Sequence, residues 1–431
     1  MLTVIRAAWP LLFGVLLLQL SHGLMGTLLG VRANIENFST TTTGIVMSGF
    51  YLGILAGSML TRHLAVRVGH VRVFAGLVSL ASSSVLIFAI LVDPFSWFAM
   101  RFLTGFCIAG ATIVAESWLN SSASNEHRGE LLSVYMLVVT GGMALGQFLI
   151  NIGDPSGFQI FVLASILVSI AIVPMLLTAS PVPMVTTSGK LGLKGLFRFS
   201  PLATVGIIGC GLSQGPLFAI GPVYAGLVGF SVGQISVFMA LLIAGGMLFQ
   251  WPIGRISDRL DRRQVLTVLS LLAAGTAAFV GFYGDAPTLT LQLLFFLLGG
   301  LCIPLYSLCI SYVNDYLNAD EIVAASGALV MGYGVGAIAG PSIAAALMQW
   351  MGPAGLPFWL VAVNGSVGAF AIYRMTQRDS VPLDEQGSYV PIPATSAIAA
   401  NMAQETASEP AIDNNISTAP PEPVTSPQGS T

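Results

Sequence analysis

The stretch RFLTGFCIAGATIVAESWLN, from Arg101 to Asn120, decides the fold of this chain. It is apolar over nearly its whole length, and an α-helix needs about 20 mostly apolar residues to cross a bilayer core of about 30 Å. Glu116 interrupts it before any obvious loop begins. Because a carboxylate at mid-bilayer depth costs roughly 2.5–3.5 kcal/mol, Glu116 is either a substrate or proton site or a structural contact near the membrane surface.

The composition of the whole chain agrees with a membrane protein. Of its 431 residues, 55% are hydrophobic and 8% are charged, whereas soluble domains carry about 25% charged residues. The four cysteines lie in apolar segments and form no CxxC pair. They are therefore predicted to be small buried side chains rather than disulfides or metal ligands, and we expect no metal and no cofactor.

Two functional classes are excluded at this point. The net charge is −3, and the chain has no basic block with interleaved aromatic residues, so we expect no nucleic acid partner. No phosphate-binding loop, HExxH motif, nucleophile triad or dinucleotide fingerprint stands in a usable context. The chain is therefore not predicted to be an enzyme.

Apolar runs bounded by Gly, Pro and charged residues predict twelve membrane spans. They cover residues 8–31, 41–63, 72–92, 96–119, 131–151, 157–178, 200–225, 232–253, 264–284, 288–312, 322–349 and 355–374. The longer connection 179–199 divides the chain into six-helix bundles at 1–178 and 200–374. Residues 375–431 are rich in Pro, Ser, Thr and Ala. This composition buries too little apolar surface to order itself, and we predict a disordered cytoplasmic tail.

The basic residues predict the orientation in the membrane. With the N-terminus in the cytoplasm, 14 of the 16 Lys and Arg residues fall on the cytoplasmic side of the spans. The exceptions are Arg32, outside, and Arg101, within a helix. Short cytoplasmic loops carry an excess of Lys and Arg, so both termini are predicted to be cytoplasmic in a multi-pass protein of the cytoplasmic (inner) membrane.

The two halves of the chain repeat each other. An offset of 192 residues places SHG at Ser21–Gly23 on SQG at Ser213–Gly215, and Gly53 on Gly245. An offset of 194 places Gly105 on Gly299, and Gly142 and Gly146 on Gly336 and Gly340. Two parallel six-helix repeats place a site at their interface near the midplane, reached by rocking of the halves.

The motifs resemble those of the major facilitator superfamily over residues 8–374. The loop GRISDRLDRR, Gly254–Arg263, resembles the family signature between the second and third helices of each half. The stretch RFLTGFCIAG, Arg101–Gly110, resembles its fourth-helix pattern of Arg followed four residues later by Gly. The stretches VAESWL, RGELLSVYM and PIGRISD look most like the YcaD-like branch. The resemblance implies an all-α membrane protein with twelve transmembrane helices, the major facilitator fold.

The signature loop is predicted to be part of a cytoplasmic gate. Asp258 lies close to helix ends, where a carboxylate can accept backbone N–H groups, and Arg259 can pair with it or with anionic lipid. The resemblance implies a latch between helices; alternatively these charges only set the topology. The first half keeps Arg67 opposite Arg259 but has Val66 opposite Asp258, so its loop has lost the carboxylate.

Glu116 is the predicted replacement for this missing carboxylate. It lies about four residues before the end of its span, on the side of the loop that holds Arg67, and Arg128 opens the next span on the same side. A similar acid followed by RG occurs in the family's sugar porters, where the resemblance implies an inward gate. We therefore expect Glu116 to pair with Arg67 or Arg128 when the cytoplasmic side is closed. The alternatives are a solvated carboxylate at a helix end and a substrate-binding group.

Polar residues inside the spans are the candidates for substrate binding, because they are costly there. Gln19 and His22 lie three residues apart, on one helix face, and Gln214 is the repeat mate of His22. His22 could also titrate near neutral pH. The alternative is that these side chains form interhelical hydrogen bonds.

Two further residues complete the predicted substrate site. Arg101 is the only basic residue that lies inside a predicted span rather than at its end, and the resemblance links this arginine to proton handling or to substrate anions. Its alternative partners are Asp93 and a lipid headgroup. Tyr306 is a candidate wall residue, with packing as the alternative.

These features predict a secondary active transporter of a small organic solute that works by alternating access in the lipid bilayer, with proton-coupled efflux as one form of it. The few charges favour export of an apolar or amphipathic compound over uptake of a charged nutrient. The alternative is a non-transporting protein of the same fold, acting as a membrane sensor or assembly factor. We expect a monomer.

Overall fold

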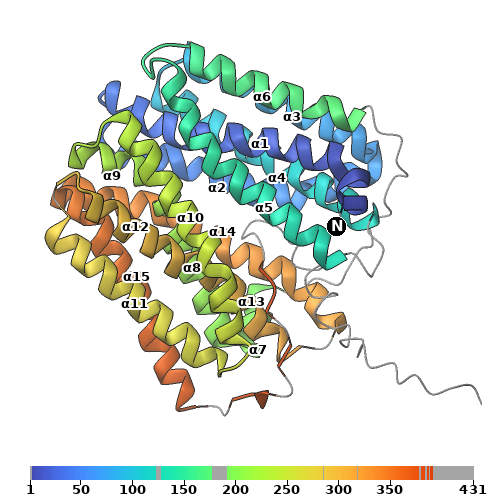
Figure 1. Cartoon of the computed structure of the whole chain (residues 1–431), viewed down its shortest axis with the longest axis vertical. Helices are drawn as coiled ribbons and strands as arrows, with labels where there is room; N and C mark the ends of the chain where they lie inside the picture. The colour runs from blue at the N-terminus through green and yellow to red at the C-terminus, as the bar shows by residue number, and fades with distance from the viewer. Residues whose placement is uncertain are drawn as a thin grey trace, which may run out of the picture.

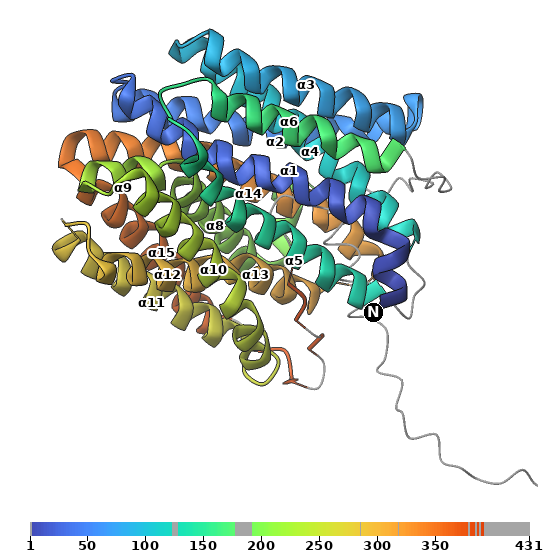
Figure 2. The ribbon, with the colours of Figure 1, turned by 45° about the horizontal axis from the view of Figure 1, so that its top comes forward.

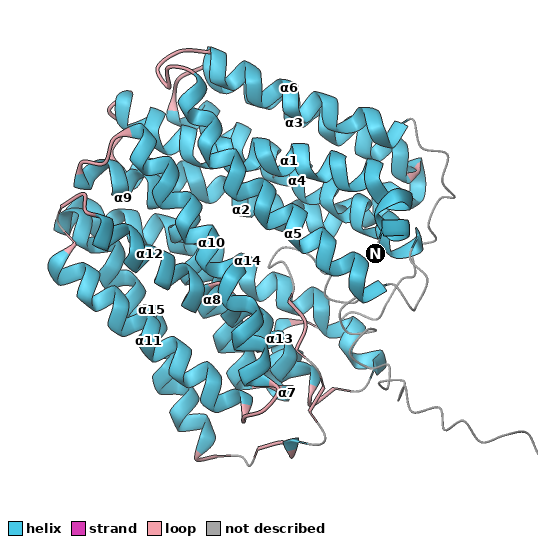
Figure 3. Cartoon of the chain, viewed as in Figure 1, coloured by secondary structure: helices cyan, strands magenta, loops and turns pink. Residues whose placement is uncertain are grey.

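The computed structural model describes residues 2–122, 128–176, 192–284, 286–317, 319–377, 380–383, 386–387 and 389–391. The described residues are helical or lie in loops and turns, without a strand (Figure 3). The first half contains α1 (Leu2–Ile35), α2 (Thr40–Val68), α3 (His70–Ile90), α4 (Pro94–Ser122), α5 (Arg128–Gly146), η2 (Gln147–Ile152) and α6 (Gln159–Leu176). The second half contains α7 (Leu193–Phe199), α8 (Pro201–Ala219), α9 (Gly221–Val228), α10 (Val232–Ser257), α11 (Arg262–Tyr283), α12 (Leu289–Cys302), α13 (Pro304–Asn314), α14 (Ala319–Met351), η3 (Gly352–Ala354) and α15 (Gly355–Met375).

Eleven stretches of the described residues are long and apolar enough to cross a membrane. The last of them, Ala325–Met375, contains both α14 and α15, which are separated by a turn at Gly352, where φ is +71°. The described residues therefore hold twelve crossings, and the predicted all-helical membrane fold is confirmed.

The two halves lie side by side. Figure 1 shows α1–α6, in blue and green, above the helices of the second half, in green to red. Figure 2 shows that α14 lies against the first half, and α2 is the helix that it contacts there, through a hydrogen bond between Ser48 and Ser342. The interface between the halves is therefore built in part by α2 and α14.

The predicted repeat appears in the helix crossings. A Cβ added to Gly105 would overlap the carbonyl oxygen of Phe50 on α2, and one added to Gly299 would overlap the carbonyl oxygen of Leu242 on α10. Phe50 and Leu242 are themselves 192 residues apart. The same close backbone contact thus joins α2 to α4 and α10 to α12, and glycine permits it because it has no side chain.

Two of the predicted spans are broken helices. The span at 288–312 consists of α12 and α13, which meet where Pro304 follows Ile303. The span at 200–225 consists of α8 and α9, with Pro222 at the start of α9. Proline has no backbone N–H to donate and its ring clashes with the preceding turn, so each proline starts a new helix inside the membrane.

Candidate functional site

On the face away from the start of α1 and the end of α15, which we call the far face, the halves are in contact (Figure 1). The backbone N of Thr40 donates to Oε1 of Gln349 over 3.0 Å, and the hydroxyls of Ser48 and Ser342 are 2.8 Å apart. Asn151 Nδ2 donates to Oγ of Ser236 over 2.9 Å. These contacts join α2 to α14 and η2 to α10, so the far face is closed.

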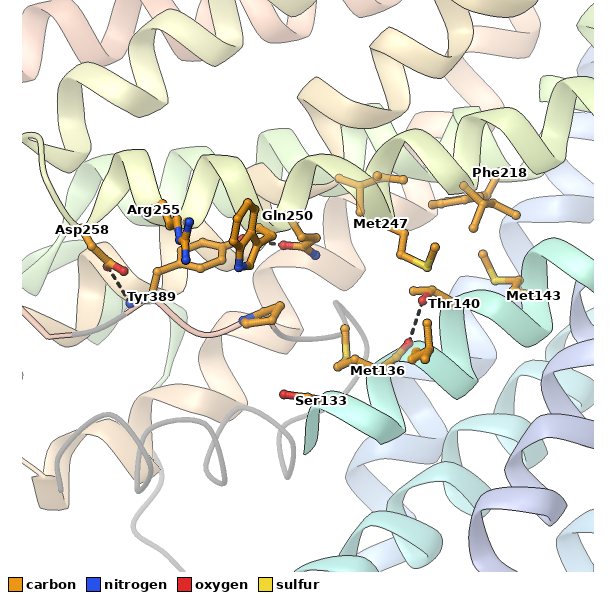
Figure 4. Close-up of a pocket in the computed structure, with 17 residues that line it drawn as sticks. Ser133, Met136, Thr140, Met143, Phe218, Met247, Gln250, Arg255, Asp258 and Tyr389 are labelled. Atoms are coloured by element: carbon orange, nitrogen blue, oxygen red, sulfur yellow. Dashed lines mark hydrogen bonds between the residues drawn. The ribbon is translucent and has the colours of Figure 1, made fainter. Parts of the chain in front are cut away.

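On the opposite face, which holds the start of α1 and the end of α15, a cavity of about 460 Å³ lies between the halves. We call it the mouth cavity. The first half contributes α5, and the second half contributes mainly α10 (Figure 4). Its lining is Ser133, Met136, Leu137, Thr140, Met143, Phe218, Ile243, Gly246, Met247, Gln250, Trp251, Gly254, Arg255, Asp258, Ile303, Tyr389 and Pro391. We call the face with the mouth cavity the terminal face. Since the far face is closed and the terminal face is open, the space between the halves opens to one side only.

The chemistry of the mouth cavity changes with depth. Its deep part is lined by Met143, Met247 and Phe218, which are soft apolar side chains that adapt to ligands of different shape. Near the terminal face the lining becomes polar, with Gln250 and Asp258. The Arg255 guanidinium lies over the Trp251 ring, 3.8 Å from its centroid. This arrangement suits an amphipathic molecule.

The signature loop forms an ion cluster at the edge of the mouth cavity. Arg262 is almost fully buried, and its Nη1 contacts Asp315 Oδ1 at 2.5 Å. Its Nη2 lies 3.5 Å from Asp258 Oδ1, and Nη1 also donates to the carbonyl oxygen of Ser311 over 2.8 Å. Burial raises the pKa of the Asp315 carboxyl to about 6, although the Arg262 charge acts in the opposite direction. The cluster ties the α10–α11 loop to the end of α13.

The predicted gate residues lie in different environments. Glu116 is fully buried in α4, so it is not a solvated carboxylate, and Tyr135 Oη of α5 donates to its Oε1 over 2.5 Å. Arg67 and Arg259 are exposed. The side chain of Arg128 lies outside the described residues.

His22 and Arg101, two of the predicted substrate residues, line a second, small cavity of about 20 Å³ inside the first half. Such a volume holds about one water molecule. Arg101 Nη2 lies 2.9 Å from Sδ of Met47, and its guanidinium lies 4.9 Å from the Phe50 ring centroid. No ion pair among the described residues includes Arg101, and its Nε has no hydrogen-bond partner there.

Asp93, the alternative partner of Arg101, has another role. Its Oδ1 accepts the backbone N–H of Ser96 over 2.9 Å and caps the first turn of α4. Arg101 is thus a nearly buried cation that is held by a thioether and an aromatic ring rather than by a carboxylate.

The other predicted substrate residues are not part of the lining of the mouth cavity. Gln214 is buried, and its Nε2 donates to the carbonyl oxygen of Cys302 over 2.9 Å, so it joins α8 to α12. Tyr306 is buried, with its ring 5.3 Å from that of Tyr333 and its hydroxyl without a partner among the described residues. Gln19 packs beside Gly142, where an added Cβ would lie 3.1 Å from Gln19 Cβ.

The sequence interpretation missed several residues of the mouth cavity. Met136, Met143 and Met247 are apolar residues in apolar helices, so no sequence signal separates them from core methionines. Asp315 had a usable signal, because it is a carboxylate directly after the apolar span predicted at 288–312. Tyr389 had none, since it lies in the segment predicted as a disordered tail, yet it lines the cavity.

Comparisons with known proteins show which family the chain belongs to. The model of the Major Facilitator Superfamily matches residues 11–299 and 228–401. The uncharacterized MFS-type transporter YcaD of Escherichia fergusonii is 29% identical over 382 residues, which cover 88% of this chain and 98% of that protein. YcaD of Escherichia coli O6:K15:H31 is 31% identical over 355 residues, which cover 81% of this chain and 91% of that protein.

Two solved structures are similar in fold. A variant of the nucleoside transporter NupG has a TM-score of 0.74 at 14% identity, covering 85% of this chain and 99% of that chain. An inward-facing, unoccupied bacterial homologue of the human lysosomal transporter Spinster has a TM-score of 0.65 at 15% identity, covering 95% of this chain and 99% of that chain. At these identities the similarity concerns the fold.

Proposed function

Because the chain belongs to the major facilitator superfamily, we propose that it is a secondary transporter that moves a small organic solute by alternating access across the cytoplasmic (inner) membrane. Its curated relatives are named as transporters, which are not an enzyme class. The observation that carries the proposal is the one-sided opening between the halves. Contacts such as Ser48 with Ser342 close the far face, whereas the mouth cavity of about 460 Å³ opens on the terminal face.

We propose that the terminal face is cytoplasmic, so that this structure is the inward-facing state. The support is the distribution of charge, because 14 of the 16 Lys and Arg residues fall on that side in the predicted topology.

The proposed substrate is an amphipathic organic molecule. The deep wall of Met143, Met247 and Phe218 offers apolar contact, and Arg101 is a nearly buried cation without a carboxylate partner among the described residues. A buried charge without a counter-charge is unfavourable. Arg101 would therefore stabilise an anionic or electron-rich group of a substrate in a state where the small cavity, which holds about one water here, is widened. Export is the proposed direction, since an amphipathic compound enters the mouth from the cytoplasm or the inner leaflet.

Proton exchange is the proposed coupling. His22 lies beside Arg101 in the small cavity, and Glu116 is a buried carboxylate nearer the terminal face. These are titratable groups at two depths of the first half, as a relay requires.

Flux in proteoliposomes tests the proposal. Liposomes that contain the purified protein are loaded with anionic, neutral or cationic amphipathic dyes. Release of each dye is followed with and without a proton gradient. We expect gradient-dependent release of at least one dye, and a loss of about tenfold or more with Arg101→Gln, because a buried charge–ligand contact is worth a few kcal/mol. Ser83→Ala is the matched control, since Ser83 is exposed on α3.

An absence of release for every dye, with folded protein shown by its melting transition, would contradict transport. It would support the alternative of a sensor or assembly factor with the same fold.

A further inference from the structure

Part of the C-terminal tail is folded back against the mouth cavity. We call the described residues Gln386, Gly387 and Tyr389–Pro391 the tail segment. Tyr389 and Pro391 line the cavity together with α5 and α10 (Figure 4). These residues belong to the stretch 375–431, and their placement puts the tail segment at the entrance of the proposed substrate path.

The backbone of the tail segment is held by the ion cluster of the signature loop. The backbone N of Tyr389 donates to Asp258 Oδ1 over 2.8 Å, and that of Gly387 donates to Asp315 Oδ1 over 3.2 Å. The Gly387 carbonyl oxygen accepts from Arg262 Nη2. Each of these hydrogen bonds involves a charged partner, and such bonds are stronger than neutral ones.

The side chain of Tyr389 fits a space that a glycine provides. Its ring lies against Gly254, where an added Cβ would come within 2.5 Å of Tyr389 Cδ1. Its hydroxyl donates to Oε1 of Gln250 over 2.5 Å. Backbone hydrogen bonds and a seated aromatic ring together form a specific peptide-docking surface, made by Gln250, Gly254, Asp258, Arg262 and Asp315.

We propose that this surface is a docking site for the chain's own tail segment, and that the docked segment holds the mouth open. Tyr389 and Pro391 share the cavity lining with Met136 and Leu137 of α5. α5 therefore cannot close onto this end of α10 until the tail segment leaves. The docking of the tail segment does not depend on the proposed function. Its effect on the mouth cavity rests on that function, because it requires alternating access.

The docking is tested in the full-length protein in lipid nanodiscs. The native cysteines Cys107, Cys210, Cys302 and Cys309 are buried, so a nitroxide can be placed at Val390→Cys alone. We expect a restricted spectrum in the parent protein and a mobile one in Tyr389→Ala and Gly254→Val. Gly275→Val is the matched control, because a Cβ there meets no atom within 4 Å. A mobile nitroxide in the parent would overturn the docking.

The effect on the mouth is tested by the distance between spin labels at Leu137→Cys and Trp251→Cys, which lie on its two sides. We expect Tyr389→Ala to raise the short-distance, closed population about tenfold, because it removes both the hydroxyl hydrogen bond to Gln250 and the ring contact with Gly254. Gly254→Val should do the same alone and add nothing in the Tyr389→Ala protein.

The two measurements separate the two proposals. A restricted nitroxide at Val390 with unchanged distances in both variants would keep the docking and overturn its effect on the mouth. Failure of alternating access itself would appear in the flux assay, which does not depend on the tail segment.

Discussion

At the scale of single residues, Glu116 shows how a carboxylate is kept inside the bundle. It is fully buried, and Tyr135 donates a hydrogen bond to it from the neighbouring helix over 2.5 Å. A buried charge is tolerated only where polar partners replace water. This contact joins α4 to α5, and α5 is the first-half wall of the mouth cavity.

Removal of the Tyr135 hydroxyl is therefore expected to destabilise the protein. Tyr135→Phe should lower the free energy of unfolding by about 1.5–3 kcal/mol, the usual range for a hydrogen bond to a charged group. In a Glu116→Gln background the acceptor is neutral, and the same change should cost about 0.5–1.5 kcal/mol. Thermal unfolding in detergent measures both. Equal costs in the two backgrounds would show that the Glu116 charge does not matter to this contact.

The role of Glu116 in a gate stays a prediction. The sequence analysis did not foresee the hydrogen bond from Tyr135, 19 residues further along the chain. Arg67 is exposed. Side-chain partners across helices depend on the rotation of each helix about its axis, and apolar periodicity does not fix that rotation in an all-apolar span.

At the scale of elements, close helix crossings hold each half together. Gly53 and Gly105 form the crossing of α2 with α4, and Gly245 and Gly299 form that of α10 with α12. In the membrane such crossings rest on van der Waals contact between backbones, because lipid is as apolar as the side chains.

Side chains at these glycines should separate the helices. Gly53→Ala and Gly245→Ala would each place a Cβ against a backbone carbonyl oxygen, that of Phe102 or of Phe296. We expect each to lower the free energy of unfolding by about 1–3 kcal/mol or more, as overpacking does. Gly76→Ala is the control, since no atom lies within 4 Å of its added Cβ. Tolerance of both substitutions, measured by thermal unfolding, would rule out the crossings as a source of stability.

The helix crossings could be predicted from the sequence, whereas the breaks within helices could not be predicted as well. Matching glycines at offsets of 192 and 194 fall on matching crossings, because a duplicated bundle keeps its closest contacts. Pro304 and Pro222 start new helices within spans, yet Pro341 lies inside the unbroken α14. Whether a proline bends or divides a helix depends on how neighbouring helices satisfy the freed carbonyl groups.

At the scale of the whole molecule, the two faces differ in how the halves meet. The far face is tied by hydrogen bonds between α2 and α14 and between η2 and α10. The terminal face is separated by the mouth cavity. The composition and spans predicted the fold, but they could not predict which face is open, since both arrangements bury the same helices.

A disulfide across the far face should arrest transport. The Ser48 and Ser342 hydroxyl oxygens are 2.8 Å apart, so Ser48→Cys with Ser342→Cys places two thiols within reach of a bond. We expect oxidant to reduce dye release to background and reductant to restore it, with Ser48→Cys alone unaffected. Full release from protein that is completely cross-linked would contradict opening of the far face during transport.

Tyr51 lies between these two faces. Its hydroxyl donates to the carbonyl oxygen of Gly215 over 3.2 Å, which joins α2 to α8 at the middle of their spans. When the halves rock as rigid bodies, a contact at mid-depth lies close to the rotation axis, where displacement is smallest. The hydrogen bond from Tyr51 to Gly215 would then keep its length while the contacts at the two faces form and break. This hydrogen bond thus lies at a depth where it can persist through the conformational change.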